Sequence, residues 1–139
     1  MSVITKTRVV KTTGEVDIID LTDLLKDYLT QTTLTSGIVT VFVGGSTVGI
    51  TTIEYEPGLK SDLPRVLDRL FPKGDDYSHN GAWGDGNGHS HIRSVFMPPS
   101  ITIPFVDSAI QLGRWQQVVL VEFDVRPRAR NVIFQFMGE

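Results

Sequence analysis

The sequence predicts a single α+β domain over residues 1–139, with helices packed on one face of a sheet. Stretches typical of strands outnumber those typical of helices, and the helices come singly between pairs of strands. The chain is long enough for one hydrophobic core, and its 40% hydrophobic and 21% charged residues are ordinary for a globular protein. No internal repeat, low-complexity tract or interdomain linker divides it.

The first elements are two strands and a helix. Residues 3–13 mix Val and Thr with Lys and Arg, which is typical of a strand with one solvent-exposed face. Gly14 predicts a turn, and residues 16–19 resume strand chemistry. Asp20 is suited to cap a helix, because its side chain can accept from free amides of the first turn. The apolar residues that follow at helical spacing are Leu21, Leu24, Leu25 and Tyr28.

The middle of the chain predicts a hairpin followed by a second helix. Residues 38–43 and 50–56 have strand composition, and the intervening Gly44-Gly45 predicts the turn between them. A helix is then expected from Ser61 to Pro72, with Pro64 tolerated in its first turn. Its shared apolar face consists of Leu63, Val66, Leu67 and Leu70.

The last part of the chain predicts a short helix and three strands. The helix is expected over residues 90–96, where Pro98-Pro99 ends it. The strands are expected at residues 101–105, 118–123 and 131–137, and the second of these is strongly apolar.

Charge and composition exclude several classes of protein. A net charge of −3 argues against a nucleic-acid binder, which usually presents a basic face. Without cysteine there is neither disulfide nor thiolate chemistry. No apolar run reaches the roughly 20 residues of a membrane helix, and residues 1–6 lack the apolar run of a signal peptide. We therefore expect a cytoplasmic protein that binds neither membranes nor nucleic acid.

All three histidines lie between residues 79 and 91, in a segment whose glycine content predicts a loop outside the core. Neutral imidazoles ligate divalent metals, so His79, His89 and His91 are predicted metal ligands for a zinc-like ion or magnesium, with a position open for water or substrate. His89 and His91 would share a side on an extended segment and splay apart on a helix. The alternative is a polar loop in which His and Asn satisfy backbone groups.

Two further segments are candidates for binding an anion. The Gly44–Thr47 turn offers backbone amides and the hydroxyls of Ser46 and Thr47, although a plain hairpin turn explains it equally well. Arg126, Arg128 and Arg130 lie close to a strand end, where guanidinium groups can bind phosphate bidentately. The alternative is a solvated connection in which these arginines pair with Asp124.

Carboxylates on strands provide candidates for proton transfer. Glu54 and Glu56 share one strand face, and Glu122 and Asp124 share another. A buried Glu54 could act as a general acid or base. The alternative is a set of exposed carboxylates on a wet strand face, which is the commoner arrangement.

Taken in order, these pieces resemble the YjbQ-type family, described as secondary thiamine-phosphate synthase enzymes. The likeness runs from Gly37 almost to the end of the chain. It rests on Gly37–Val41, Ser46-Thr47 followed by Ile50 and Glu54, Asp62 at a helix start, Tyr77-x-His79, Asn87-x-x-x-His91, Leu112-Gly113-x-Trp115-Gln116, Glu122, Arg128-x-Arg130 and Gly138. Many members have His-Thr-Thr-Ala where this chain has Gly45-Ser46-Thr47-Val48, so the first histidine of that pattern is absent.

The resemblance implies a fold, an assembly and a reaction. The fold is a mixed, curved sheet with helices on one face, and the assembly is a homotrimer with pockets between subunits. The reaction joins a hydroxymethylpyrimidine diphosphate to a thiazole phosphate and releases pyrophosphate, with a divalent ion able to bridge the leaving group.

The resemblance also implies roles for individual residues toward a small phosphorylated metabolite. Arg128 and Arg130 would clamp phosphate. Ser46, Thr47 and Asn87 would add hydrogen bonds. Glu54 and Asp62 are candidates for proton transfer or support, together with His79 and His91 as catalytic residues, and Trp115 could cover an aromatic substrate. Two other functions stay open: a trimeric metal- or anion-binding protein, and a metal-assisted hydrolase.

Overall fold

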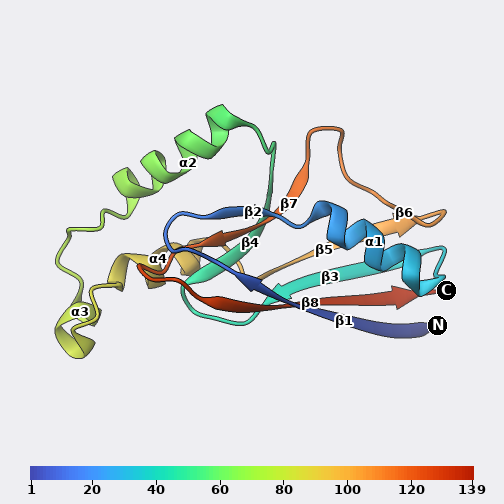
Figure 1. Ribbon diagram of the computed structural model, residues 1–139, viewed down its shortest axis with the longest axis horizontal. Helices are drawn as coiled ribbons and strands as arrows, with labels where there is room; N and C mark the ends of the chain where they lie inside the picture. The colour runs from blue at the N-terminus through green and yellow to red at the C-terminus, as the bar shows by residue number, and fades with distance from the viewer.

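The structure, a computed structural model, describes residues 1–139 and contains two antiparallel sheets and four helices. The strands of the larger sheet, here sheet A, are in spatial order β1 (Ser2–Lys11), β8 (Ala129–Gly138), β3 (Gly37–Val43), β5 (Ser100–Val106) and β6 (Ala109–Ile110). Those of the smaller sheet B are β2 (Ile18–Asp20), β7 (Gln117–Glu122) and β4 (Val48–Ile53). The helices are α1 (Thr22–Thr32), α2 (Pro57–Leu70), α3 (Ser78–Trp83) and α4 (Gly88–Phe96). Figure 1 shows α3 at one end of the molecule and both termini at the other.

The main core lies between one face of sheet A, sheet B and α1. Strand β8 alternates buried and exposed residues along its length, and its buried side chains Val132, Phe134 and Phe136 point into this core. Helix α1 adds Leu25 and Leu29 at helical spacing, both almost fully buried. The alternation in the sequence therefore decides which face of sheet A is covered.

Sheet B is covered on both faces because its central strand is apolar throughout. Val118 and Leu120 of β7 belong to the main core. Val119 and Val121 point the other way and pack with Leu67 of α2. A strand buried on both sides carries a continuous apolar run, as residues 118–121 do.

Sheet A has no such second layer within the chain. Its face away from the core, here called the outer face, is defined by the cross-strand register. The residues on it are Val3, Thr5, Thr7, Val9 and Lys11 of β1, Ala129, Asn131, Ile133, Gln135 and Met137 of β8, Ile38, Thr40 and Phe42 of β3, and Ser100, Thr102, Pro104 and Val106 of β5. Hydrogen bonds between neighbouring side chains, such as Thr40–Thr102 at 3.1 Å, agree with this assignment.

The α+β class is confirmed, and two details of the sheet predictions were wrong. Every strand pairing is antiparallel, whereas the resemblance implied a mixed sheet. The expected hairpin over residues 38–56 does not form, because β3 pairs with β5 and β8 while β4 pairs with β7. The Gly44–Thr47 segment instead carries the chain from sheet A to sheet B.

The helix predictions were right in place and wrong in extent. Helix α2 begins at Pro57 rather than Ser61, because the Glu56 carboxylate accepts from the amides of Gly58 and Leu59. Pro64 consequently lies inside the helix, not in its first turn. The histidine segment forms helices α3 and α4, and His89 is fully buried although glycine content predicted a loop outside the core. No helix is long and apolar enough to cross a membrane.

Candidate functional site

The polar side chains of the predicted site gather where β4 begins and β7 ends. Antiparallel pairing sets Val48 opposite Glu122, so Thr47 and Asp124 flank the same end of sheet B. The start of β8 brings Arg128 and Arg130 there, since the Thr12 amide donates to the Arg128 carbonyl at 2.9 Å. Helix α4 packs against β4 and carries the histidine segment to this end.

Arg130 and Glu122 form a buried ion pair at the base of the site. The Glu122 carboxylate is fully buried and accepts from both Nε (2.7 Å) and Nη2 of Arg130. Nη2 also donates to Thr47 Oγ1 at 2.8 Å, and Thr12 Oγ1 donates to Glu122 at 2.8 Å. Arg130 is therefore committed to protein partners on its Nε and Nη2 atoms.

Asp124 connects this base to the open part of the site. Its Oδ2 accepts from Arg128 Nε at 2.7 Å and from the Thr47 hydroxyl at 3.3 Å, and its Oδ1 accepts from the Val125 amide at 2.8 Å. Burial raises the pKa of Asp124, but the bonds from Arg128 and the Val125 amide outweigh it and lower the pKa below its usual value. Asp124 is thus a carboxylate at neutral pH, paired with a half-buried arginine.

Asn87 bridges Asp124 and the histidines. Its side-chain amide lies 3.4 Å from Asp124 Oδ1 on one side and 3.1 Å from His79 Nε2 on the other. With the amide nitrogen turned toward α3, it donates to Asp85 Oδ1 at 2.9 Å and to His79 at 3.1 Å. Asn87 is buried, so its position is fixed relative to both groups.

His79 and His91 meet above Asn87. Their ring centroids are 4.3 Å apart, one ring carried by α3 and the other by α4. Burial and the neighbouring His79 lower the pKa of His91, so its imidazole is neutral at pH 7. Asp85 approaches His79 Nε2 at 3.6 Å. Two imidazoles, two carboxylates and one arginine therefore line one end of the molecule.

His89 does not join this pair, because helical spacing turns it to the other side of α4. Its Nε2 lies 2.7 Å from Glu15 Oε2, and Glu15 also pairs with Lys73 at 2.6 Å. The splayed arrangement expected for i and i+2 positions on a helix is the one that forms. The His89 Nδ1 atom is buried without a hydrogen-bond partner.

The structure separates the remaining candidates from the histidines. Glu54 is exposed beyond the far end of β4, about 20 Å along the chain from Thr47 at the ~3.3 Å rise of a strand residue. There it lines a shallow hollow with Trp115 and Arg114. Asp62 is exposed on α2 and pairs with Arg65 at 2.7 Å. Ser46 is exposed beside the site, where its backbone hydrogen-bonds to His91.

Two of the three predicted metal ligands, His79 and His91, lie together, and the third, His89, does not. His79 and His91 are adjacent, and the lowered pKa of His91 favours the neutral ring that ligates metals. Asp85 supplies a carboxylate oxygen beside His79. No three such side chains gather in metal-ligating geometry. His79 and His91, with Asp85, are the residues that would hold an ion here, and the metal prediction stays a prediction.

Several residues of the site were missed or misjudged in the sequence. Glu122 and Asp124 are both fully buried, whereas exposed carboxylates on a strand face are the commoner arrangement. Their burial could have been predicted, because they follow a continuous apolar run and such strands are buried on both faces. Neither Asp85 nor Glu15 was a candidate from the sequence, and Glu15 offered no signal because its partner His89 lies far along the chain. The alternative pairing of Arg128 with Asp124 is confirmed.

A family model and several relatives identify the family to which this chain is similar. The family model "UPF0047 protein YjbQ-like" matches residues 6–139. A UPF0047 protein of Methanothermobacter thermautotrophicus is 32% identical over 139 residues, covering 100% of this chain and 95% of that protein. The UPF0047 protein YugU of Bacillus subtilis is 31% identical over 134 residues, covering 96% and 98%.

Solved structures share the whole fold. A hypothetical protein from Aeropyrum pernix K1 superimposes with a TM-score of 0.91 at 29% identity, over 98% of this chain and 99% of that one. An uncharacterised YjbQ/UPF0047 protein from Clostridium acetobutylicum gives 0.87 at 32% identity, over 95% and 99%. The arrangement of sheets that forms the site is therefore shared with these proteins.

Proposed function

The chain belongs to the UPF0047 family of YjbQ-like proteins, and we propose that it binds a small phosphorylated metabolite at the His79–His91 end and acts there as a thiamine-phosphate synthase-type transferase. The reaction joins a hydroxymethylpyrimidine diphosphate to a thiazole phosphate and releases pyrophosphate. A site for it must hold two phosphorylated groups and stabilise negative charge on the leaving group.

One observation carries this proposal: the adjacent His79 and His91 lie at the same end as Asn87, Thr47 and Arg128. These residues come from separate segments of the chain, and each belongs to a motif of the family resemblance. The neutral His91 ring has a free nitrogen lone pair that can accept a proton. Asn87 and Thr47 are both buried, and the Thr47 hydroxyl donates to Asp124, so they are preorganised before any ligand arrives.

Within the arginine pair, the geometry favours Arg128 as the group that meets an anion. Arg130 is almost fully buried and holds Glu122 and Thr47. Arg128 is half-buried, with 35% of its side chain exposed and one carboxylate partner. A phosphate arriving at Arg128 would have to share it with Asp124, and a divalent ion, when bound, would offset that carboxylate and the phosphate charge.

Titration calorimetry with pyrophosphate and thiamine phosphate, with and without magnesium or zinc, tests this proposal. Arg128→Ala should lose roughly 2–5 kcal/mol of binding free energy, because a charged hydrogen bond in a partly desolvated site is removed. Arg126→Ala is the matched control, since Arg126 is exposed two residues away. Pyrophosphate release from the two phosphorylated precursors measures turnover. Equal binding by wild type and Arg128→Ala would show that Arg128 is structural.

A second function has a specific observation in its favour. The adjacent His79 and His91 rings beside Asp85 are also what a metal-binding module or a metal-assisted hydrolase needs. Metal analysis after loading with zinc or magnesium, together with the turnover assay, distinguishes this second function from the transferase. His79→Ala and His91→Ala should each lower the bound metal, while His89→Ala should not. Metal binding without turnover of thiamine precursors would favour this second function.

The proposal includes an assembly and a location. We propose a homotrimer, as the family resemblance implies, with the His79–His91 end placed at a subunit boundary. The cytoplasm is the proposed location, since a chain without cysteine has no need of an oxidising compartment.

A further inference from the structure

Trp83 is the last residue of α3, and it is 76% exposed. Tryptophan is well buried on average, so a tryptophan this exposed beside a candidate site is unusual. No residue of α3 is buried, and the Trp83 indole takes part in none of the aromatic contacts within the chain. The indole is therefore available to a molecule from outside the chain.

Trp83 and His79 lie on the same side of α3. They are spaced i and i+4, which makes two side chains of a helix neighbours, with Cβ atoms about 5–6 Å apart. His79 in turn contacts His91, with ring centroids 4.3 Å apart. The exposed indole therefore continues the surface that the two imidazoles form.

A polar contact holds α3 in this orientation and leaves the space beside Trp83 open. The Gly88 amide of α4 donates to Asn80 Oδ1 of α3 at 2.8 Å. A Cβ atom at Gly84, the residue after Trp83, would have no atom within 4 Å. Figure 1 shows α3 beyond the ends of both sheets. A planar ligand can therefore reach the indole without displacing another part of the chain.

The ends of this surface carry side chains of opposite charge. The Asp85 carboxylate, two residues after Trp83, is 43% exposed and lies 3.6 Å from His79 Nε2. The face of a tryptophan attracts a cation, and a carboxylate accepts hydrogen bonds from a ring amine. Arg128 on the other side of the site has 35% of its side chain exposed. One end therefore suits a cationic or amino-substituted ring, and the other suits a phosphate.

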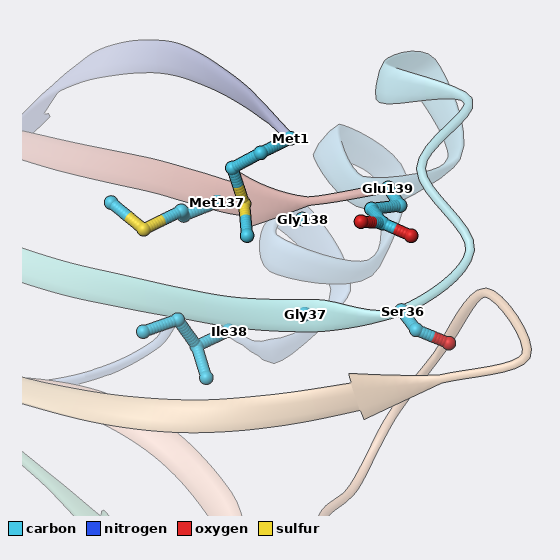
Figure 2. A pocket seen from close by; sticks show the side chains of 7 residues that line it. All are labelled: Met1, Ser36, Gly37, Ile38, Met137, Gly138 and Glu139. Atoms are coloured by element: carbon cyan, nitrogen blue, oxygen red, sulfur yellow. The ribbon is translucent and has the colours of Figure 1, made fainter.

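The hollows of the molecule do not provide a place for such a ring beside the histidines. Figure 2 shows the hollow near the termini, which is lined by Met1, Met137 and Glu139. A second lies beside Trp115 and a third beside Lys26, and neither includes His79 or His91. A ring held at the His79–His91 end therefore needs an exposed apolar surface rather than a cavity wall.

We propose that Trp83 is an aromatic platform on which the ring of a cationic or amino-substituted heteroaromatic phosphate stacks, with the phosphate directed toward Arg128. This inference rests on the proposed function and names the chemical class of its ligand. Stacking on the indole selects such ligands over phosphates that carry no ring, because a ring-free phosphate makes no contact with the aromatic face. Trp83 is thus a specificity-determining residue, whereas Arg128 binds either kind of phosphate.

Titration calorimetry with two probes, with and without magnesium, tests the platform. Thiamine phosphate carries an aminopyrimidine and a cationic thiazolium ring, and pyrophosphate carries no ring. Trp83→Ala should bind thiamine phosphate roughly 5- to 100-fold more weakly, which is the effect of removing one stacked aromatic side chain, and should bind pyrophosphate as wild type does. Trp83→Phe should keep most of the affinity, because phenylalanine retains an aromatic face. Arg128→Ala should weaken the binding of both probes.

Fluorescence gives a second measurement, because the protein has only two tryptophans. In the Trp115→Phe variant all tryptophan emission comes from Trp83. Thiamine phosphate should quench this emission, and pyrophosphate should leave it unchanged. Circular dichroism and light scattering confirm that each variant keeps the fold and the mass of wild type.

Unchanged binding of thiamine phosphate by Trp83→Ala would overturn the platform and leave the proposed function standing. Equal weakening of both probes by Trp83→Ala would also overturn it, since the substitution would then act on the histidines. A loss confined to Trp115→Ala would place the ring in the hollow beside Trp115 instead. A changed mass of Trp83→Ala would show that the indole covers a subunit contact rather than a ligand. If wild type binds neither probe, the proposed function fails together with this inference.

Discussion

Arg128 and Arg130 are one residue apart, and the structure gives them different environments. Arg130 lies against a fully buried carboxylate, whereas Arg128 stands at the rim beside Asp124. In the sequence they were equivalent candidates for a phosphate clamp. The two arginines differ in how deeply each pair is buried. Glu122, the partner of Arg130, lies in the interior because it ends the apolar run of β7.

Arg130→Ala should therefore destabilise the protein by about 3–5 kcal/mol, because it leaves the Glu122 carboxylate buried without its cation. Arg128→Ala should cost about 1–2 kcal/mol, since Asp124 keeps the Thr47 hydroxyl and the Val125 amide. Urea unfolding of both variants at pH 7 measures the difference. Equal losses of unfolding free energy in the two variants would contradict the idea that burial makes the Arg130–Glu122 pair the more important one for stability.

Glu15 makes stability depend on pH. Burial raises the pKa of Glu15, but the hydrogen bonds from Lys73 and His89 outweigh it, so the pKa in the folded protein is below the usual 4.5. The unfolded chain then binds the proton more readily. The stability from Glu15 is present above about pH 4.5 and is lost as the pH falls through the lower folded pKa.

Glu15→Gln should remove this contribution. We expect the variant to be less stable than wild type at pH 7 by about 1–3 kcal/mol, because the bonds to His89 and Lys73 lose their charge. The gap between the two proteins should narrow between pH 5 and pH 3. Urea midpoints across this range check it, and a constant gap would contradict the assignment. Asp124, whose pKa is also lowered, leaves some pH dependence in both proteins.

At the scale of elements, the approach of α3 to α4 sets the distance between His79 and His91. Gly88 permits this approach, because a Cβ there would lie 2.5 Å from Tyr77 Cβ, and its amide donates to Asn80 Oδ1 at 2.8 Å. Gly81 lies inside α3 with nothing within 4 Å of its Cβ position. Alanine at Gly88 would therefore clash, whereas alanine at Gly81 would not, so Gly81→Ala is a matched control for Gly88→Ala.

Gly88→Ala should destabilise the protein by about 1–3 kcal/mol and weaken binding at the histidines, because overpacking pushes the two helices apart. Gly81→Ala should raise stability by roughly 0.5–1 kcal/mol, since alanine restricts the unfolded chain at no steric cost. Thermal unfolding and calorimetry measure both effects. A neutral Gly88→Ala would show that α3 is free to move.

Element types were largely predictable from the sequence, and pairings were not. The period-2 pattern of residues 131–137 and the apolar run of 118–123 give β8 and β7 almost to the residue. The absent hairpin shows the limit, because Gly44-Gly45 is equally suited to a turn within one sheet and to a crossing between two. The same holds for the site: local spacing grouped the three histidines, and helix geometry then divided them.

At the scale of the whole molecule, the proposed homotrimer predicts a mass of about three times the 15.4 kDa chain. Light scattering at micromolar concentration measures it. A mainly apolar interface should keep this mass at high salt, because apolar contacts lose nothing to screening. Dissociation by salt alone would indicate an ionic interface elsewhere on the protein.

Strand β8 lies between β1 and β3, and this placement sets an order of events during synthesis. Strand β1 pairs only with β8, from Ser2↔Gly138 to Lys11↔Ala129. At about 5–20 residues per second, β1 waits roughly 6–25 s for its partner to be made. During that time it is an unpaired edge able to recruit other chains. Lys6, Arg8 and Lys11 are the charges that oppose such pairing. Replacing Lys6 and Arg8 by threonine should therefore lower the soluble yield in cells more than it lowers the unfolding midpoint of the purified protein, and a yield that follows the midpoint would show that the wait is harmless.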